Sequence, residues 1–137
     1  MDDATAMVRR LAQATNAHDL DALADCFAED YHNETPVHPA RGFHGRDQVR
    51  ANWRQIFAGV PDIRARVRRT IADGTSAWSE WELSGTRRDG AQHLMRGVVI
   101  FEVAGGRATS GQFYLEPVDV DEADVNAAIQ RAVGATS

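Results

Sequence analysis

The sequence predicts an α+β fold in which three N-terminal helices cover one face of an antiparallel sheet. Two observations lead to this prediction. Apolar side chains recur at helical spacing, about every 3.6 residues, through three segments of the first 57 residues. After residue 62 they alternate with polar side chains, as in strands, and turns containing glycine separate the strands. Because 137 residues suffice to bury one core, we expect residues 1–137 to form a single domain.

The first half of the chain carries three predicted helices and one extended segment. The first helix covers residues 4–17. Asp19 can cap a second helix, which we expect to run through Phe27. Residues 31–37 are predicted to be extended and lead into an irregular loop that contains prolines. A third helix covers residues 46–57, and a Gly-Val-Pro sequence ends it.

The second half of the chain carries four predicted strands and a short final helix. The strands form an antiparallel meander and cover residues 63–71, 78–85, 92–103 and 107–118. Residues 119–133 are predicted to form a helix with an acidic start, packed over an edge of the sheet, before a frayed tail at residues 134–137. One layer of helices cannot cover both faces of a sheet that is apolar on both sides. We therefore expect a homodimer packed through the outer sheet face.

The composition excludes several classes of protein. The net charge of −5 argues against a nucleic-acid partner, although all 15 basic residues are arginine. The sequence contains no run of about 18 apolar residues, the length that a membrane-spanning helix needs. The start of the chain lacks the pattern of a signal peptide, so we expect a cytoplasmic protein. The single cysteine, Cys26, excludes an internal disulfide and lies in an apolar segment typical of a buried structural thiol.

Several short motifs resemble the SnoaL-like family of the nuclear transport factor 2 superfamily. They are the Asn-Ala-His-Asp-Leu-Asp sequence at residues 16–21, Phe-Ala-Glu-Asp-Tyr at 27–31, the Gly-Arg helix start at 45–46, and Gly-Val-Val-Ile-Phe at 97–101 followed by Gly-Arg at 106–107. The resemblance covers nearly the whole chain. It implies a cone-shaped fold with a pocket between the concave sheet and the helices, commonly in a dimer. The superfamily also contains ketosteroid isomerases, limonene-type epoxide hydrolases, cyclases, dehydratases and binding proteins, so the fold alone does not imply an activity.

Two well-understood catalytic arrangements of this superfamily are missing from the sequence. The tyrosine and the two aspartates of a ketosteroid isomerase correspond to Leu11, Thr35 and Val99. The arginine and two aspartates of a limonene-type hydrolase correspond to Glu80, Glu82 and Phe113. The resemblance therefore argues against both reactions by those mechanisms.

The predicted strand at residues 78–85 carries the first catalytic candidates. Alternation places Trp78, Glu80 and Glu82 on one face and Trp81 and Leu83 on the other. The pattern alone favours solvent for the glutamates, but the resemblance places them in the pocket and puts Trp81 and Leu83 at the subunit contact. In the pocket, desolvation and repulsion between the two carboxylates would keep one glutamate ionised as a base and its neighbour protonated as an acid.

Two histidines are the assisting candidates. His93 shares a strand face with predicted pocket residues, and His32 lies on the extended segment at the pocket rim. Solvent exposure and a structural hydrogen bond are the alternatives for each. Tyr114 and Glu116 point to the outer face by alternation, where Arg96 could pair with Glu116. The sequence leaves open whether Glu80 and Glu82 or Tyr114 and Glu116 face the pocket.

The predicted pocket wall is largely apolar, which indicates a small apolar ligand. The expected substrate-binding residues are Leu11, Tyr31, Thr35, Asn52, Trp53, Ile56, Trp78, Met95, Val99, Phe101, Phe113 and Leu115. With the resemblance, this wall predicts a cofactor-independent acid/base enzyme acting on an apolar, carbonyl-bearing metabolite, such as a polyketide cyclase-like protein, an isomerase, a dehydratase or an epoxide-opening enzyme. The alternative is a non-catalytic ligand-binding or dimeric accessory protein.

We predict no metal site from the sequence. His32, Glu34, His38 and His44 are the candidate ligands. They are spread through a loop broken by prolines and lack the His-x-x-x-His spacing that places two imidazoles on one helix face.

Overall fold

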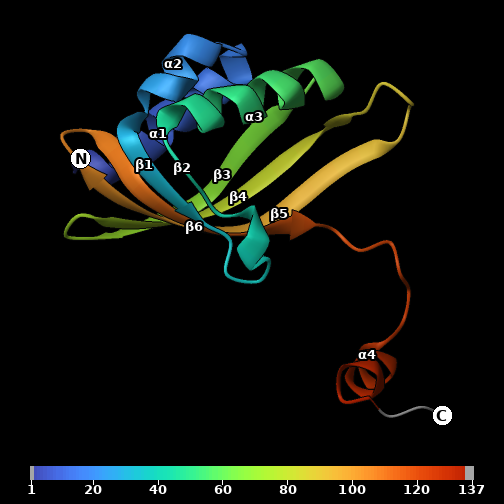
Figure 1. Ribbon diagram of the computed structural model, residues 1–137. Helices are drawn as coiled ribbons and strands as arrows, with labels where there is room; N and C mark the ends of the chain where they lie inside the picture. Colours follow the sequence, from blue (N-terminus) through green and yellow to red (C-terminus); the bar gives the residue numbers. More distant parts are fainter. Residues whose placement is uncertain (1, 135–137) are drawn as a thin grey trace.

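The computed structural model describes residues 2–134 and shows a layer of helices over one face of a curved sheet (Figure 1). The helices are α1 (Asp3–Ala17), α2 (Leu20–Asp25), α3 (Arg46–Gly59) and α4 (Val125–Ala132), with a short 3-10 turn η1 (Pro39–Arg41). The strands are β1 (Phe27–Glu34), β2 (Phe43–His44), β3 (Arg64–Asp73), β4 (Ser76–Thr86), β5 (Gln92–Ala104) and β6 (Arg107–Pro117). The α+β prediction is confirmed. We call the sheet face under α1, α2 and α3 the inner face and the opposite one the outer face.

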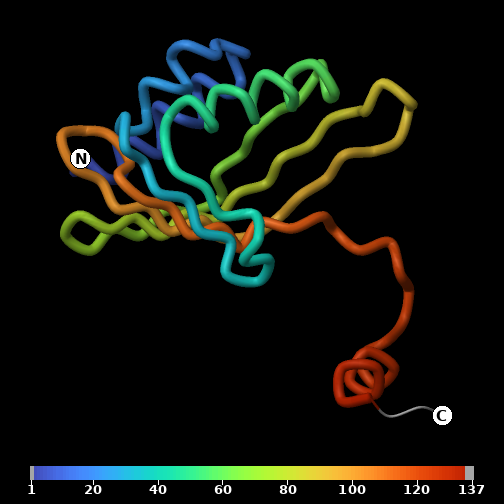
Figure 2. Tube along the Cα trace, in the orientation of Figure 1, coloured from blue at the N-terminus to red at the C-terminus, as the bar shows by residue number. Residues whose placement is uncertain are grey.

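The sheet contains the predicted meander and two further strands. Its order is β2-β1-β6-β5-β4-β3, and β1 runs parallel to β6 while the other neighbours are antiparallel. The tube trace shows β1 beside β6, which joins the first half of the chain to the second (Figure 2). The second helix is shorter than predicted, because Phe27 enters the core as the first residue of β1.

The Asn-Ala-His-Asp motif holds the helix layer on the sheet. The side chain of Asn16 donates to Ala65 O at 2.9 Å and accepts from Ala65 N at 2.7 Å, so it satisfies both backbone groups of a β3 residue. A ring nitrogen of His18 lies 2.8 Å from Ile63 O. Asp19 accepts a hydrogen bond from Ala22 N at 3.0 Å and so caps α2. The motif therefore fixes both the end of α1 and the start of α2.

The core lies between α1 and the inner face of the sheet. Met7, Val8 and Leu11 of α1 are buried in one apolar cluster with side chains of β3, β4, β5 and β6. The central strands contribute Trp81, Leu83, Val99 and Phe101, all with exposed fractions of 5% or less. Burying this apolar surface is the main force that holds the helices on the sheet.

The last helix stands apart from the rest of the molecule (Figure 1). Its apolar stripe of Val125, Ile129 and Val133 is exposed, so the expectation that this segment packs over a sheet edge is wrong. Asp124 caps α4 through a hydrogen bond from Ala127 N, so the helix is specified locally. Residues 135–137 of the predicted tail lie outside the described part of the chain. No helix among residues 2–134 is long and apolar enough to cross a membrane.

Candidate functional site

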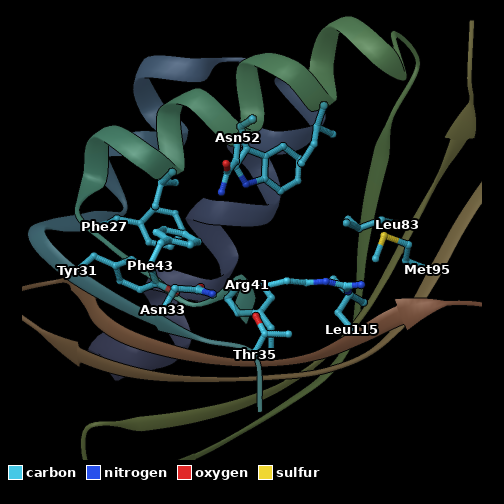
Figure 3. Close-up of a pocket in the computed structure, with 14 residues that line it drawn as sticks. Phe27, Tyr31, Asn33, Thr35, Arg41, Phe43, Asn52, Leu83, Met95 and Leu115 are labelled. Atoms are coloured by element: carbon cyan, nitrogen blue, oxygen red, sulfur yellow. The ribbon is translucent and has the colours of Figure 1, made fainter. Parts of the chain in front are cut away.

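A cavity of about 340 Å³ lies between α3 and the inner face of the sheet (Figure 3). Strand β1, the loop after it, β2, α3 and the ends of three meander strands line it. The lining residues are Phe27, Tyr31, Asn33, Thr35, Arg41, Phe43, Val49, Asn52, Trp53, Ile56, Leu83, Met95, Phe113 and Leu115. A smaller apolar space continues it towards Leu11, Trp81, Val99 and Phe101. Most of the wall is apolar, so its few polar groups decide what it can bind.

The first polar group is the buried pair of Tyr31 and Asn33. Both face inward because residues two apart in a strand share a face. The hydroxyl of Tyr31 donates to Asn33 Oδ1 at 2.7 Å, which leaves the amide nitrogen of Asn33 turned to the cavity (Figure 3). Gly111 makes room for this hydroxyl, because a Cβ there would overlap it. Burial raises the pKa of Tyr31, so the phenol stays protonated and the pair presents a donor.

The second polar group is the guanidinium of Arg41, which comes from the loop between β1 and β2. Its side chain extends across the cavity towards Leu115 (Figure 3). Within the described residues, none of the ion pairs includes Arg41. The loop therefore brings to an apolar cavity a cation that has no protein carboxylate as its partner.

Two further polar groups stand at opposite sides of the cavity. Thr35 follows the end of β1. Asn52 lies on α3, and its Oδ1 accepts from Gln48 Nε2 at 2.8 Å. That hydrogen bond turns the Asn52 amide nitrogen towards the cavity (Figure 3). The wall therefore presents mainly hydrogen-bond donors, and its described lining contains no carboxylate, imidazole or thiol.

The predicted binding residues lie around this cavity with one exception. All of them border the cavity or its extension except Trp78. The indole of Trp78 is 53% exposed on the outer face, so its placement in the pocket is wrong. Contact of the other residues with a ligand stays a prediction.

The two glutamates of β4 were predicted to face the pocket, and this placement is wrong. Strands β4 and β5 pair without a register shift from Ser76 to Thr86, and directly opposed residues share a sheet face. Glu80 and Glu82 lie opposite Val98 and Arg96 on the outer face. The inward residues of β4 are those opposite Val99, Gly97 and Met95, namely Ser79, Trp81 and Leu83.

Both glutamates pair with arginines instead of with each other. Glu80 lies 3.3 Å from Arg69 Nε, and Glu82 accepts from Arg96 Nε at 2.8 Å. The hydrogen bond and the charge of Arg96 hold the pKa of Glu82 below its usual range. A general acid at neutral pH needs a raised pKa, so Glu82 has the opposite tuning.

Two of the inward residues of β4 were also predicted in the wrong place. Trp81 and Leu83 are only 4% and 5% exposed beneath the helices, so they cannot form the predicted subunit contact. Tyr114 and Glu116 do lie on the outer face, as predicted from alternation. Glu116 pairs with His38 at 2.9 Å and not with Arg96. Therefore neither Glu80 with Glu82 nor Tyr114 with Glu116 faces the cavity.

The two candidate histidines also lie away from the cavity. His93 is on the predicted inner side of β5, paired with Gly85, but it is not among the cavity residues. His32 alternates with Tyr31 and Asn33 and so points outward, where Glu34 Oε1 lies 3.0 Å from its Nε2. None of the four residues predicted to be catalytic therefore lines the cavity.

The polar centre of the cavity, Asn33 and Arg41, was not predicted from the sequence. Asn33 shares a strand face with the predicted residues Tyr31 and Thr35, so the alternation used elsewhere would have found it. Arg41 carries no such signal, because it lies in an irregular loop without a period. Phe27, Phe43, Val49 and Leu83 complete the set of lining residues that were not predicted.

Comparisons with known proteins agree with this architecture. The family model of the SnoaL-like domain matches residues 8–111. A protein from Kribbella flavida, proposed to be a ketosteroid isomerase, is 25% identical with a TM-score of 0.68, over 89% of this chain and 82% of that one. An epoxide hydrolase of Mycobacterium tuberculosis, described as LEH-like, is 18% identical with a TM-score of 0.74, over 97% of both chains. No curated protein sequence gives a significant match.

A third similar structure has no known function. It is an NTF2-like protein from Burkholderia pseudomallei, 19% identical with a TM-score of 0.72, over 98% of this chain and 100% of that one. The likeness to this protein and to the epoxide hydrolase shows the fold alone.

Proposed function

The chain belongs to the SnoaL-like domain family, and we propose that it binds a small, largely apolar, carbonyl-bearing metabolite between its helices and its sheet. One observation carries the proposal. The cavity is apolar except for a group of hydrogen-bond donors, and its described lining has no acidic side chain. An apolar wall selects an apolar body, and a few placed polar groups fix its orientation.

The donors define the polar end of the ligand. Asn33 and Asn52 turn amide nitrogens into the cavity, and Arg41 adds a guanidinium (Figure 3). Asn33 is buried, Asn52 is half-buried and Arg41 is exposed to solvent. A ligand that displaces the water from a donor without supplying an acceptor loses about 1 to 3 kcal/mol, so a ligand with an acceptor oxygen is favoured over a hydrocarbon of the same shape. A carbonyl or carboxylate oxygen meets this requirement, and an ammonium group does not.

The volume limits the size of the ligand. A cavity of about 340 Å³ lies near the lower end of the range for small-molecule sites, about 300 to 1,000 Å³. The apolar extension towards Trp81 and Phe101 gives the hydrocarbon part of the ligand a place away from the donors. A metabolite with one or two rings and an oxygen at one end fits this division.

A second candidate function is cofactor-independent catalysis on the same kind of metabolite. Arg41 and Asn33 favour it, because donors aimed at a carbonyl oxygen stabilise the negative charge that develops when a neighbouring proton leaves or a double bond shifts. Tyr31 would stay a donor, since burial raises its pKa. The base would have to come from the substrate or from water, and for this reason ligand binding is the function that the geometry supports best.

The proposal is tested by titrating the protein with two probes of the same carbon skeleton, acetophenone and ethylbenzene, followed by ligand-observed NMR. We expect acetophenone to bind more tightly. Arg41→Met should weaken acetophenone binding by about tenfold, the lower end for a charge-assisted hydrogen bond, and leave ethylbenzene unchanged.

The matched control is Arg66→Met, which removes an exposed arginine from the outer face. It should bind both probes as the wild type does. Equal affinity of the wild type for the two probes, or an unchanged preference in Arg41→Met, would contradict the proposed role of the donors. Assembly into a homodimer through the outer face stays a prediction.

A further inference from the structure

Two histidines stand opposite each other on β1 and β2, outside the cavity. His32 and His44 are direct cross-strand partners. Gly45 N donates to Tyr31 O, so the adjacent pair is hydrogen-bonded and His32 and His44 occupy a pair without backbone hydrogen bonds. In such a pair the Cα atoms are about 4.5 Å apart and the side chains are closest. Both rings project from the outer face, since Tyr31 and Phe43 beside them face the cavity.

The nitrogen atoms of the two rings are about as far apart as those of two imidazoles on one metal ion, while the ring centroids are closer together than in such a complex. The ring centroids are 4.3 Å apart, and His32 Nδ1 lies 3.3 Å from His44 Nδ1 and 3.1 Å from His44 Nε2. A tetrahedral zinc ion with Zn–N bonds of about 2.0 to 2.1 Å holds its nitrogens about 3.3 to 3.4 Å apart. His32 Nδ1 lies almost equally far from the two nitrogens of His44, so the His44 ring must turn to direct one of them at the ion, and its exposure allows this rotation.

A third side chain orients His32. Glu34 Oε1 lies 3.0 Å from His32 Nε2, and Gln112 Nε2 donates to the other oxygen of Glu34 at 3.4 Å. A carboxylate on Nε2 keeps the proton on that nitrogen and leaves the lone pair of Nδ1 directed at His44. This is the carboxylate, histidine and metal arrangement in which the outer residue fixes the tautomer and the ring of the ligand.

We propose that His32 and His44 bind a divalent transition-metal ion of the zinc class across the β1 and β2 pair. Imidazole nitrogens suit zinc, copper and nickel, whereas magnesium and calcium require oxygen ligands. No group of three or more His, Cys, Asp or Glu side chains converges on one point in residues 2–134. The protein therefore supplies two ligands, and water completes the coordination.

The site has a structural consequence for the cavity. Strand β2 is only two residues long, and Phe43 on its inner side borders the cavity. The loop that carries Arg41 ends at this strand. A metal ion held by one histidine from each strand would tie β2 and the end of this loop to β1.

No metal site was predicted from the sequence, because the candidate ligands are spread through a loop broken by prolines and lack the helical spacing of two histidines. His32 and His44 are twelve residues apart, and the strand register alone brings them together. A site of this kind is therefore not predictable from a short motif.

The proposal is tested by isothermal titration of the untagged full-length protein with zinc chloride. We expect one ion per chain, and at least tenfold weaker binding by His32→Gln and by His44→Gln. Glu34→Gln should retain the stoichiometry with about tenfold weaker affinity, as for loss of an orienting partner of a metal ligand. His93→Gln, which removes a histidine elsewhere, is the matched control and should bind as the wild type does.

Three results would overturn the proposal. They are no binding by the wild type at millimolar zinc, unchanged affinity in both His32→Gln and His44→Gln, and equal binding of magnesium and zinc. Far-UV circular dichroism of each variant checks that the fold is retained, which we expect because both histidines are solvent-accessible. The result is independent of the proposed ligand in the cavity, because no organic probe is present.

Discussion

The inner and outer faces of the same sheet differ in burial. Trp81 and Trp78 lie three residues apart on β4, yet Trp81 is 4% exposed and Trp78 is 53% exposed. The inner face is apolar and continuous with the cavity, and its one polar side chain on β4, Ser79, accepts from Trp81 Nε1 and donates to Val99 O. The outer face carries the ion pairs of Glu80 and Glu82. Register, and not composition, decides which side chains of β4 meet the cavity.

The apolar wall and the polar groups of the cavity come from different elements of the fold. The long meander strands give the cavity an apolar wall through Leu83, Met95 and Leu115. The donors come from β1, the loop after it and α3, through Asn33, Arg41 and Asn52. The meander strands that form the core keep the cavity shape, while elements outside the meander supply the polar groups, as in many sites built on rigid scaffolds.

The largest expected effect comes from truncating the two tryptophans of β4. Trp81→Ala removes a buried aromatic side chain, and we expect a loss of about 3 to 5 kcal/mol in the free energy of unfolding. Trp78→Ala changes a half-exposed position and should cost less than about 1 kcal/mol. Urea unfolding measures both, at a protein concentration where light scattering reports a monomer.

The two variants test the difference in burial between the faces. Equal losses for Trp78→Ala and Trp81→Ala would mean that the outer face is as buried as the inner one. A loss for Trp81→Ala below that for Trp78→Ala would mean that the faces are exchanged, as the resemblance to limonene-type hydrolases suggested.

A smaller effect concerns the charge of the outer face. The hydrogen bond from Arg96 lowers the pKa of Glu82 in the folded state, so the unfolded state takes up this proton first as the pH falls. The pair therefore stabilises the fold above the ordinary glutamate pKa of about 4.3, and this stability is lost as the pH falls through the folded value. We expect the free energy of unfolding of Glu82→Gln to fall less steeply than that of the wild type between about pH 5 and pH 3.

Glu122→Gln serves as the control, because it removes one carboxylate from the exposed segment before α4. The free energy of unfolding of Glu122→Gln should change with pH more nearly as that of the wild type does than the free energy of Glu82→Gln. A steeper acid loss in Glu82→Gln than in the wild type would mean that Glu82 is raised in pKa and enclosed, as an acid in a pocket would be.

Much of the fold follows from local patterns that the sequence shows. Helical spacing and capping by Asp19 predicted α1, α2 and α3, and alternation with glycine turns predicted the four meander strands. Strand β2 could not be predicted, since two residues have no period. The parallel pairing of β1 with β6 depends on contacts between distant parts of the chain, which a local pattern does not contain.

The site was predictable only where a long strand or helix builds it. The prediction of which side of β5 faces inward was correct, because Met95, Val99 and Phe101 follow the alternation of a regular strand. On β4 the pattern alone gave the right faces, and matching to relatives reversed them. A one-residue slip exchanges the two faces of a strand, so an alignment without cross-strand partners can place Glu82 on either side.

The central claim is that the inner cavity, and not the outer face with its carboxylates, is the ligand site. Methionine-methyl NMR tests it directly, because Met95 lines the cavity while Met7 is buried in the core beside it. Titration with acetophenone should shift the Met95 methyl resonance, with little change at Met7 or at the indole N–H of Trp78. A shift of the Trp78 indole with an unchanged Met95 methyl would contradict the account.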